Sequence, residues 1–481
     1  MNSMAAEQDV RPVVARTAPQ DLYRILLLQK NGTELLVTGE QPPFTLPCVE
    51  IPRWERVAEN VTAAVRKHYG ISAMCLFTPE LSLTSTDDER LLYQVMETRE
   101  TSVAAPVEAR WLPMNSSLDQ SFADRQDLAA ITGMLRQIAE FQSGEAIGPF
   151  GRPGWIEELF AWVQSEIDPY GLRLTGEFRQ LNASPTFALL RLETNRTAVW
   201  FKAVGEPNLR EFPISVTLSK LFPGFVPTVI ATHPAWNGWL TTEFSGSTLD
   251  EVSDACAWER AAQTLAQLQI ASVGKTDQLL DAGCRDVRVA SLLALLDPFL
   301  EVISRLMEQQ QKTPPPVLGR DELRTLGIQI KEALSAWAQL DIPDTLGHLD
   351  FNPGNVLCSA DQCVLLDWAE AYVGPAFLTF QYLLEHLGQA SAQREIGPQR
   401  LVDHYTSNWL CRVPPSAVAA GQQMSPLLAV FACAVASNWT EALRSGDERF
   451  AGYLRSLTRR MQRESGVLHA TRTHSCAGAV Q

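Results

Sequence analysis

The sequence predicts an α+β protein in which a mixed N-terminal domain precedes a small antiparallel sheet and a mainly helical region. The chain has 481 residues, which is more than one compact core usually holds. Strand-like and helical patterns are mixed up to about residue 143, three strand-like stretches then follow one another, and helical spacing prevails after Thr248. These observations predict domains over residues 17–143, 155–245 and 246–465.

The first domain opens with a predicted β-hairpin. Asn31-Gly32 separates the apolar runs Tyr23–Gln29 and Thr33–Thr38, and this dipeptide favours a tight turn between strands. A helix is expected from Pro52 to Tyr69, because Trp54 and the apolar residues after it follow helical spacing up to Gly70. The remaining elements expected in this domain are strands at Met74–Phe77, Leu91–Glu97 and Val107–Leu112 and a helix near Asp124–Ser143.

A Gly/Pro-rich joint at Gly144–Gly154 ends the first domain. A linking helix, Trp155–Ile167, leads into strands at Leu172–Leu181, Phe187–Glu193 and Val199–Val204, whose short connecting loops favour an antiparallel meander. A helix from about Glu206 to Leu221 and strands at Thr228–His233 and Trp239–Phe244 complete the predicted second domain. Beyond Thr248 the pattern is helical except for a short β segment around residues 346–368.

Composition excludes several classes of function. The formal charge of −15 repels a phosphate backbone, so nucleic acid is not expected as a partner. The longest apolar run, Pro426–Ser437, is shorter than the roughly 20 residues that span a bilayer, which predicts a buried helix and no membrane partner. Residues Met1–Arg16 lack the apolar core of a secretory signal, which favours a cytoplasmic protein.

The cysteines support the same location. There are nine, an odd number, and no two of them form a CxxC pair, so reduced thiols are expected. Cys358 and Cys363 flank a predicted hairpin turn. We interpret them as small semi-buried residues rather than as metal ligands or a redox pair.

The segment Leu346–Trp368 carries the strongest chemical signal. His348 and Asp350 are followed by Asn355, five residues after the aspartate, and Asp367 ends a short apolar strand. Two carboxylates and a carboxamide therefore gather at the mouth of a short hairpin. Phosphoryl transfer needs such a set, in which one carboxylate orients an attacking hydroxyl and accepts its proton while hard oxygen ligands hold Mg²⁺.

This pattern resembles the catalytic loop and metal-binding aspartate of the aminoglycoside phosphotransferase and choline kinase-like family, over about residues 172–445. The resemblance implies a bilobal protein-kinase-like fold and an ATP-dependent, Mg²⁺-dependent kinase that phosphorylates a hydroxyl of a small molecule such as an aminoglycoside or choline. It implies that Asp350 is the catalytic base and that Asn355 and Asp367 bind the metal. His348 is expected to brace the loop by hydrogen bonding.

The predicted small sheet supplies the nucleotide contacts. Lys202 lies within the apolar strand 199–204, where an unpaired ammonium is costly unless a phosphate or carboxylate meets it. By the resemblance it contacts ATP phosphates, with Glu211 as its candidate partner and Glu206 as the nearer competitor. Ser184 and Thr186 are the candidate phosphate contacts of the loop between the first two strands.

Several residues depart from the family pattern. Residues 182–186 contain no glycine, Leu349 replaces a common glycine, and no aspartate follows Asp367-Trp368 to anchor the next helix. Asp367-Trp368-Ala369 also lacks the glycine of a protein kinase. The alternative to an active kinase is a pseudokinase-like protein that binds nucleotide or docks a partner.

The N-terminal domain resembles a Nudix domain only faintly. When Gly70 is aligned with that family, its metal-binding carboxylates fall at Lys67 and His68, so hydrolysis is not expected. A docking or effector module of another α+β type is an equal alternative. In the helical region, Glu370, Glu385 and Asp403 are candidates for an acidic acceptor pocket, although solvated helix faces explain them as well.

Overall fold

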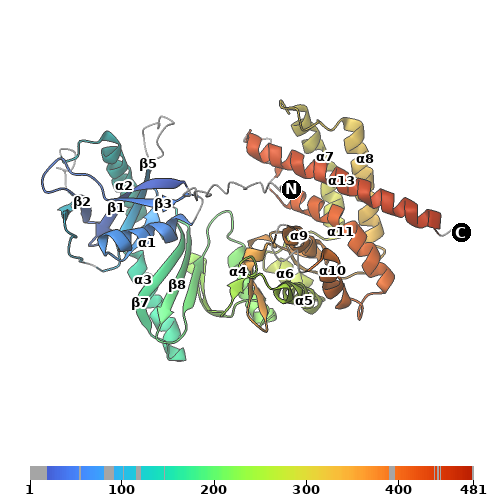
Figure 1. The fold of residues 1–481 in the computed structure, drawn as a ribbon, viewed down its shortest axis with the longest axis horizontal. Helices are drawn as coiled ribbons and strands as arrows, with labels where there is room; N and C mark the ends of the chain where they lie inside the picture. The colour runs from blue at the N-terminus through green and yellow to red at the C-terminus, as the bar shows by residue number, and fades with distance from the viewer. Residues whose placement is uncertain are drawn as a thin grey trace, which may run out of the picture. The chain divides into compact units, whose positions relative to one another are not determined.

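The computed structural model describes residues 19–478 except 54–55, 81–90, 101, 115–120, 146, 389, 391–395, 438, 441–443 and 445. The expectations for Met1–Arg16 and for Trp54 fall outside these residues. The chain divides into two compact units, Met1–Glu206 with His233–Leu240, and Pro207–Thr232 with Thr241–Gln481. The predicted α+β class is confirmed, because mixed and antiparallel sheets occupy the first unit and helices dominate the second (Figure 1).

The N-terminal part of the first unit is built on a six-stranded mixed sheet. Its strand order is β4-β5-β1-β2-β6, with β3 paired to β1. The elements are β1 (Gln20–Gln29), β2 (Glu34–Thr38), β3 (Cys48–Pro52), α1 (Val57–Tyr69), β4 (Ala73–Phe77), β5 (Leu91–Thr98), β6 (Ala109–Pro113) and α2 (Arg125–Ser143). The predicted hairpin is confirmed: β1 and β2 pair antiparallel around Asn31 and Gly32, both of which have positive φ.

Helices lie against both faces of this sheet. In β1 the side chains alternate, so Ile25 and Leu27 join a core with Val61 of α1. Arg24 points to the opposite face, where its guanidinium contacts Asp127 of α2 at 2.5 Å. The prediction that the first helix begins at Pro52 is wrong, because Cys48–Pro52 pairs with β1 as a strand and the helix begins at Val57.

A second sheet completes the first unit. It is antiparallel where β7, β8 and β9 pair, and its strand order is β10-β11-β9-β8-β7. The elements are α3 (Trp155–Ile167), β7 (Leu174–Ser184), β8 (Phe187–Thr194), β9 (Val199–Ala203), β10 (Val229–His233) and β11 (Gly238–Thr242). The sequence therefore predicted this meander and its linking helix to within a few residues.

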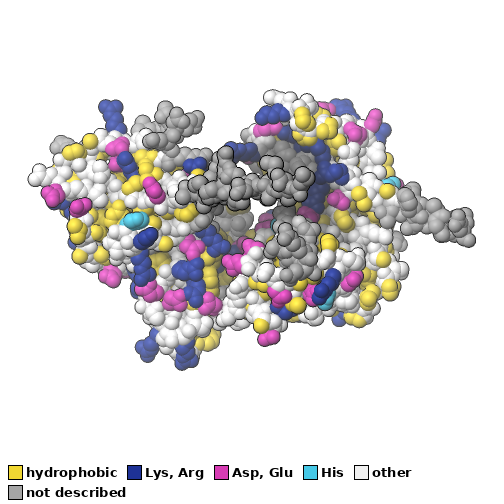
Figure 2. All heavy atoms as spheres, viewed as in Figure 1, with side chains coloured by type: hydrophobic (Ala, Val, Ile, Leu, Met, Phe, Trp, Pro, Cys, Tyr) yellow, Lys and Arg dark blue, Asp and Glu magenta, His cyan; other side chains and the backbone are white. Residues whose placement is uncertain are grey.

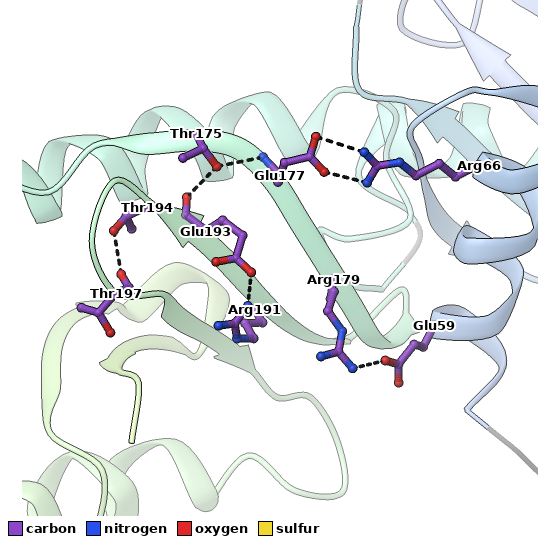
Figure 3. Close-up of polar contacts among 9 residues, drawn as sticks. All are labelled: Glu59, Arg66, Thr175, Glu177, Arg179, Arg191, Glu193, Thr194 and Thr197. Carbon is purple, nitrogen blue, oxygen red and sulfur yellow. Dashed lines mark hydrogen bonds and ion pairs between the residues drawn. The ribbon is translucent and has the colours of Figure 1, made fainter. Parts of the chain in front are cut away.

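The two sheets of the first unit contact each other through α1 and β7. Figure 3 shows two ion pairs, in which Arg66 meets Glu177 at 2.6 Å and Arg179 meets Glu59. Arg66 and Glu177 are each more than half exposed, so their pair contributes little to stability. On the face in view, acidic and basic side chains are interspersed over this part of the molecule (Figure 2).

The second unit is mainly helical. Its helices are α4 (Glu211–Leu221), α5 (Ala255–Ser272), α6 (Thr276–Asp281), α7 (Val289–Glu308), α8 (Arg320–Trp337), α9 (Leu378–Leu387), α10 (Pro398–Ser407), α11 (Pro415–Ala436) and α13 (Glu448–Gly478). Its short strands are β12 (Ser247–Thr248), β13 (Arg285–Asp286), β14 (Asp344–His348), β15 (Val356–Cys358), β16 (Cys363–Leu365) and β17 (Ala371–Pro375). Strands β14, β15 and β16 form the β segment that the sequence predicted around residues 346–368, whereas β12, β13 and β17 lie outside that range.

Helix α11 contains the longest apolar run. By length and composition alone it is long and apolar enough to cross a membrane, and it is the one such helix among the described residues. However, 67% of its most apolar window is buried inside the protein. Its buried residues include Leu428, Phe431 and Ala432, so the predicted buried helix is confirmed.

Cys358 and Cys363 form a disulfide, which corrects the interpretation of this pair as thiols. The register of β15 and β16 places the two residues directly opposite each other, with their Cα atoms 4.2 Å apart. The sequence showed the five-residue separation, but the pairing depends on the hairpin register. The six other described cysteines with placed side chains are free.

Candidate active site

The catalytic-loop motif begins at the end of a buried strand. Strand β14 pairs with β17, and its last residue, His348, is completely buried. Leu349 and Asp350 then leave the sheet in a turn, where the side chain of Asp350 becomes exposed. The main-chain N–H of Leu349 donates to the carbonyl oxygen of Glu370 at 3.0 Å, so the turn is fixed at its first residue.

His348 braces this loop, as expected from the sequence. Its Nδ1 accepts a hydrogen bond from the main-chain N–H of Asp350 at 3.0 Å, and its Nε2 lies 3.2 Å from the carbonyl oxygen of Leu366. An imidazole that accepts at Nδ1 and donates at Nε2 is neutral. Burial lowers the pKa of His348, which agrees with this neutral state. The histidine therefore joins the loop of Asp350 to the residue before Asp367.

Asn355 and Asp367 lie at the same end of the β15–β16 hairpin. The main-chain N–H of Leu366 donates to the carbonyl oxygen of Asn355 at 2.8 Å, which places Asp367 one residue from this contact. The side-chain Nδ2 of Asn355 donates to the carbonyl oxygen of Asp350 at 2.9 Å, so Oδ1 is the amide atom suited to a metal. Asp367 has a left-handed backbone with φ of 60° and an exposed side chain.

These donors fit a magnesium ion that is bound together with phosphates. Among the described residues, no group of three or more His, Cys, Asp or Glu side chains is arranged to hold a metal by itself. Mg²⁺ is commonly bound by one or two carboxylates together with substrate phosphates and water, rather than by a complete protein cage. One carboxylate and one amide oxygen match that mode of binding.

A pocket of about 610 Å³ opens beside Asp350. The described residues that line it are Leu249, Asp250, Val252, Trp258, Asp350, Asn352, Pro353, Gly354, His386 and Ala390. Two of these are carboxylates and none is Lys or Arg. The Nδ2 of Asn352 donates to Oδ1 of Asp350 at 3.1 Å, which orients the carboxylate at the pocket wall.

Sequence reasoning missed Asp250, Trp258 and His386 as residues of this pocket. They come from three segments that only the fold brings together, and Trp258 follows the helical spacing of a core residue. The acidic residues suggested from sequence do not line the pocket. Glu370 pairs with Arg285 at 2.8 Å and Glu385 pairs with Arg460, so both carboxylates are already neutralised.

Lys202 lies at the centre of the second sheet, on β9 opposite Leu189 of β8. Its side chain is partly buried, and Nζ lies 6.0 Å from the ring centre of Phe187 and 5.8 Å from that of Trp239. Aromatic faces stabilise an ammonium group through cation–π contacts.

The two carboxylates considered as partners of Lys202 differ in burial. Glu211, the first residue of α4, is only 2% exposed, whereas Glu206 is exposed and precedes the helix. A buried carboxylate needs a compensating charge or hydrogen bonds, so burial favours Glu211 as a structural ion-pair residue.

The turn between β7 and β8 contains Ser184 and Thr186, the candidate phosphate contacts. The hydroxyl oxygen of Ser184 accepts hydrogen bonds from the main-chain N–H groups of Thr186 at 3.3 Å and Phe187 at 3.0 Å. This Ser turn satisfies the donors that a glycine-rich loop leaves open to phosphate. The roles of these two residues, and of the other site residues, remain predictions.

The comparison with known families finds a match that lies mostly in the second unit. Residues 224–406 match the model of the phosphotransferase enzyme family. The match is shorter than half of the chain, but it contains Asp350, Asn355 and Asp367 and every described residue of the pocket. It confirms the resemblance inferred from the motif over this segment. Ser184 and Lys202 lie outside it.

The solved structures to which this chain is similar include the following enzymes. An ethanolamine kinase from Plasmodium vivax is 13% identical, with a TM-score of 0.42, over 59% of this chain and 81% of that one. A choline kinase from Cryptosporidium parvum is 13% identical, with a TM-score of 0.45, over 66% and 97%. A macrolide 2'-phosphotransferase from Brachybacterium faecium is 15% identical, with a TM-score of 0.38, over 62% and 97%. No curated protein matches the sequence.

Proposed function

We propose that this protein is an ATP-dependent phosphotransferase that transfers the γ-phosphate to a hydroxyl group of a small molecule. The observation that carries the proposal is the position of Asp350, whose exposed carboxylate lies on the wall of a pocket while its main chain is fixed by buried His348. A carboxylate held in this way can orient an acceptor hydroxyl and take its proton. The match of residues 224–406 to the phosphotransferase enzyme family supports the reaction class.

Four of the predicted residues have a direct part in this proposal. Asn355 and Asp367 would hold Mg²⁺, and Lys202 would contact the phosphates. When bound, ATP with Mg²⁺ supplies the phosphoryl group and neutralises its charge. The protein's own contribution is to orient the acceptor and to remove the hydroxyl proton at the carboxylate of Asp350.

The pocket lining favours an acceptor that carries positive charge. Asp250 and Asp350 contribute two carboxylates, and the described lining offers no Lys or Arg to balance them. Trp258 lies behind the same wall, but its side chain is fully buried in the core, so the two carboxylates carry this preference. We therefore expect amino- or ammonium-containing alcohols to be better acceptors than neutral sugars or acidic metabolites.

Two measurements test the proposal. Thermal unfolding with ATP and Mg²⁺ together should raise the melting temperature above that with either alone, and phosphate transfer should then be measured on matched cationic and neutral alcohols. Transfer to at least one cationic alcohol is the expected result. Nucleotide binding without transfer to any acceptor of the panel would favour the pseudokinase-like alternative. The absence of nucleotide binding would contradict the kinase and leave only the docking form of that alternative.

A further inference from the structure

The β7–β8 turn contacts a segment that lies outside the second sheet. We propose that the connector Gly148–Phe150, which joins the N-terminal sheet to α3, is a positioning element that holds this turn for nucleotide binding. The inference rests on the proposed function, because it takes Ser184 and Thr186 as the residues that meet the nucleotide.

A main-chain hydrogen bond ties the connector to the tip of the turn. The N–H of Phe150 donates to the carbonyl oxygen of Pro185 at 3.0 Å. Ser184 binds the N–H groups of Thr186 and Phe187 within the turn, whereas the hydrogen bond from Phe150 comes from another part of the chain. The position of the tip is therefore set partly by a residue that does not belong to β7, β8 or the rest of the sheet.

Phe150 is itself firmly anchored. Its side chain is 2% exposed and packs edge-on against Trp155 of α3, with ring centres 4.9 Å apart. It also packs against Phe201, with ring centres 6.3 Å apart, and Phe201 precedes Lys202 on β9. One residue thus joins the turn that carries Ser184 to the strand that carries the proposed phosphate-binding lysine.

Gly148 permits the close approach that this contact needs. Its φ of +102° is unfavourable for any residue with a side chain, and a Cβ atom there would overlap the carbonyl oxygen of Pro185 and come 2.9 Å from Cγ2 of Thr186. Gly205, just after β9, makes a similar approach from another segment, because a Cβ atom there would overlap Cβ of Thr186. The turn is therefore packed closely between two glycine backbones.

The connector also offers a matched control. Gly144 has a positive φ of +77° as well, but it is exposed and a Cβ atom there would meet nothing within 4 Å. Gly144→Ala therefore introduces backbone strain in the same segment without touching the turn, whereas Gly148→Ala introduces strain and displaces the turn. The comparison separates positioning of the turn from a general loss of stability.

The experiment measures the dissociation constant of ATP with Mg²⁺ by titration calorimetry for the full-length protein and both variants, together with their melting temperatures. We expect Gly148→Ala to weaken nucleotide binding about tenfold or more, because displacements near 1 Å are costly in such sites, while Gly144→Ala binds nearly as the parent does. Equal affinities in the two variants would overturn the proposal. If Gly148→Ala does not fold, Phe150→Leu, which keeps the N–H but shortens the anchor, is compared with Gly144→Ala in the same way.

Hydrogen exchange gives a readout that does not depend on the nucleotide. The amides of Phe150, Thr186 and Phe187 should exchange faster in Gly148→Ala than in the parent and remain protected in Gly144→Ala. If the parent protein binds no nucleotide, the proposed function fails, and exchange alone decides whether the connector holds the turn. Unchanged exchange at these amides in Gly148→Ala would refute that claim.

Discussion

The side-chain amide of Gln180 binds both main-chain polar atoms of Cys75. Its Oε1 accepts from the N–H of Cys75 at 2.8 Å, and its Nε2 donates to the carbonyl oxygen at 3.0 Å. Gln180 lies on β7 and Cys75 on β4, each at the edge of its own sheet, and both residues are no more than 1% exposed. One glutamine side chain thus provides hydrogen bonds on the outer edge of β4, whose other edge pairs with β5.

Gln180→Ala should destabilise the first unit by about 2–4 kcal/mol, because it leaves a buried N–H and a buried carbonyl without partners. Urea unfolding measures the change. Asn182→Ala on the same strand is the control, since Asn182 is exposed and binds only the adjacent N–H of Ala183. Equal unfolding midpoints for the two variants would show that the amide contact contributes nothing.

Glu97 makes the stability of the first unit depend on pH. It is 3% exposed, and burial raises its pKa from 4.5 to about 7, although the N–H of Gly154 donates to its Oε2 at 2.7 Å. The folded protein holds the proton of Glu97 more tightly than the unfolded chain does. Protonated Glu97 therefore favours the folded state below pH 4.5, and this stabilisation is lost as the pH rises to about 7. The loss amounts to at most about 3 kcal/mol.

Glu97→Gln should remove this pH dependence and make the protein more stable than the parent at pH 8, with little difference at pH 5. Denaturant unfolding at both pH values measures the effect. Glu100→Gln, at an exposed position near the end of the same strand, should leave the pH dependence of stability unchanged. If Glu97→Gln kept the pH dependence of stability of the parent protein, Glu97 would not be its source.

Asp350→Asn should leave ATP binding nearly intact and lower turnover by roughly 10²-fold or more, because the amide cannot accept the hydroxyl proton. Initial rates with the best acceptor of the panel measure this. Asp361→Asn is the matched control, since Asp361 is exposed at the tip of the β15–β16 hairpin, away from the end that carries Asn355. Parental turnover in Asp350→Asn would exclude it as the catalytic base.

Asp367→Ala should abolish the part of the ATP-induced rise in melting temperature that depends on Mg²⁺, because the metal loses its carboxylate ligand. Lys202→Ala should weaken ATP binding more modestly and leave the Mg²⁺ dependence in place. An Asp367→Ala protein whose shift with ATP and Mg²⁺ equals that of the parent would rule out the metal role.

The Cys358–Cys363 disulfide should stabilise the hairpin that carries Asn355 and Asp367. Closing so short a loop is worth about 2 kcal/mol by the chain-entropy relation. Dithiothreitol should therefore lower the melting temperature of the parent by a few degrees. The double variant Cys358→Ala/Cys363→Ala should melt at the same temperature with and without reductant. If dithiothreitol lowered the melting temperature of the parent and of the double variant equally, the change would come from other cysteines.

The sequence by itself determined most of the local structure. Periodicity and turn residues predicted the β1–β2 hairpin, the β7–β8–β9 meander and helix α11, because these features depend on residues close together in the chain. The spacing of His348, Asp350, Asn355 and Asp367 likewise predicted a site and a reaction class, because one loop and one hairpin carry all four residues.

Tertiary structure decided what depends on distant segments. Strand β3 forms through its pairing with β1, and the Cys358–Cys363 disulfide forms through strand register. The pocket combines three separate segments of the chain, within residues 249–258, 350–354 and 386–390. The contact between Gln180 and Cys75 likewise depends on the fold, because 105 residues separate them in the chain. Local preferences act between neighbours in sequence, whereas burial and long-range hydrogen bonds are fixed only when the whole chain has folded.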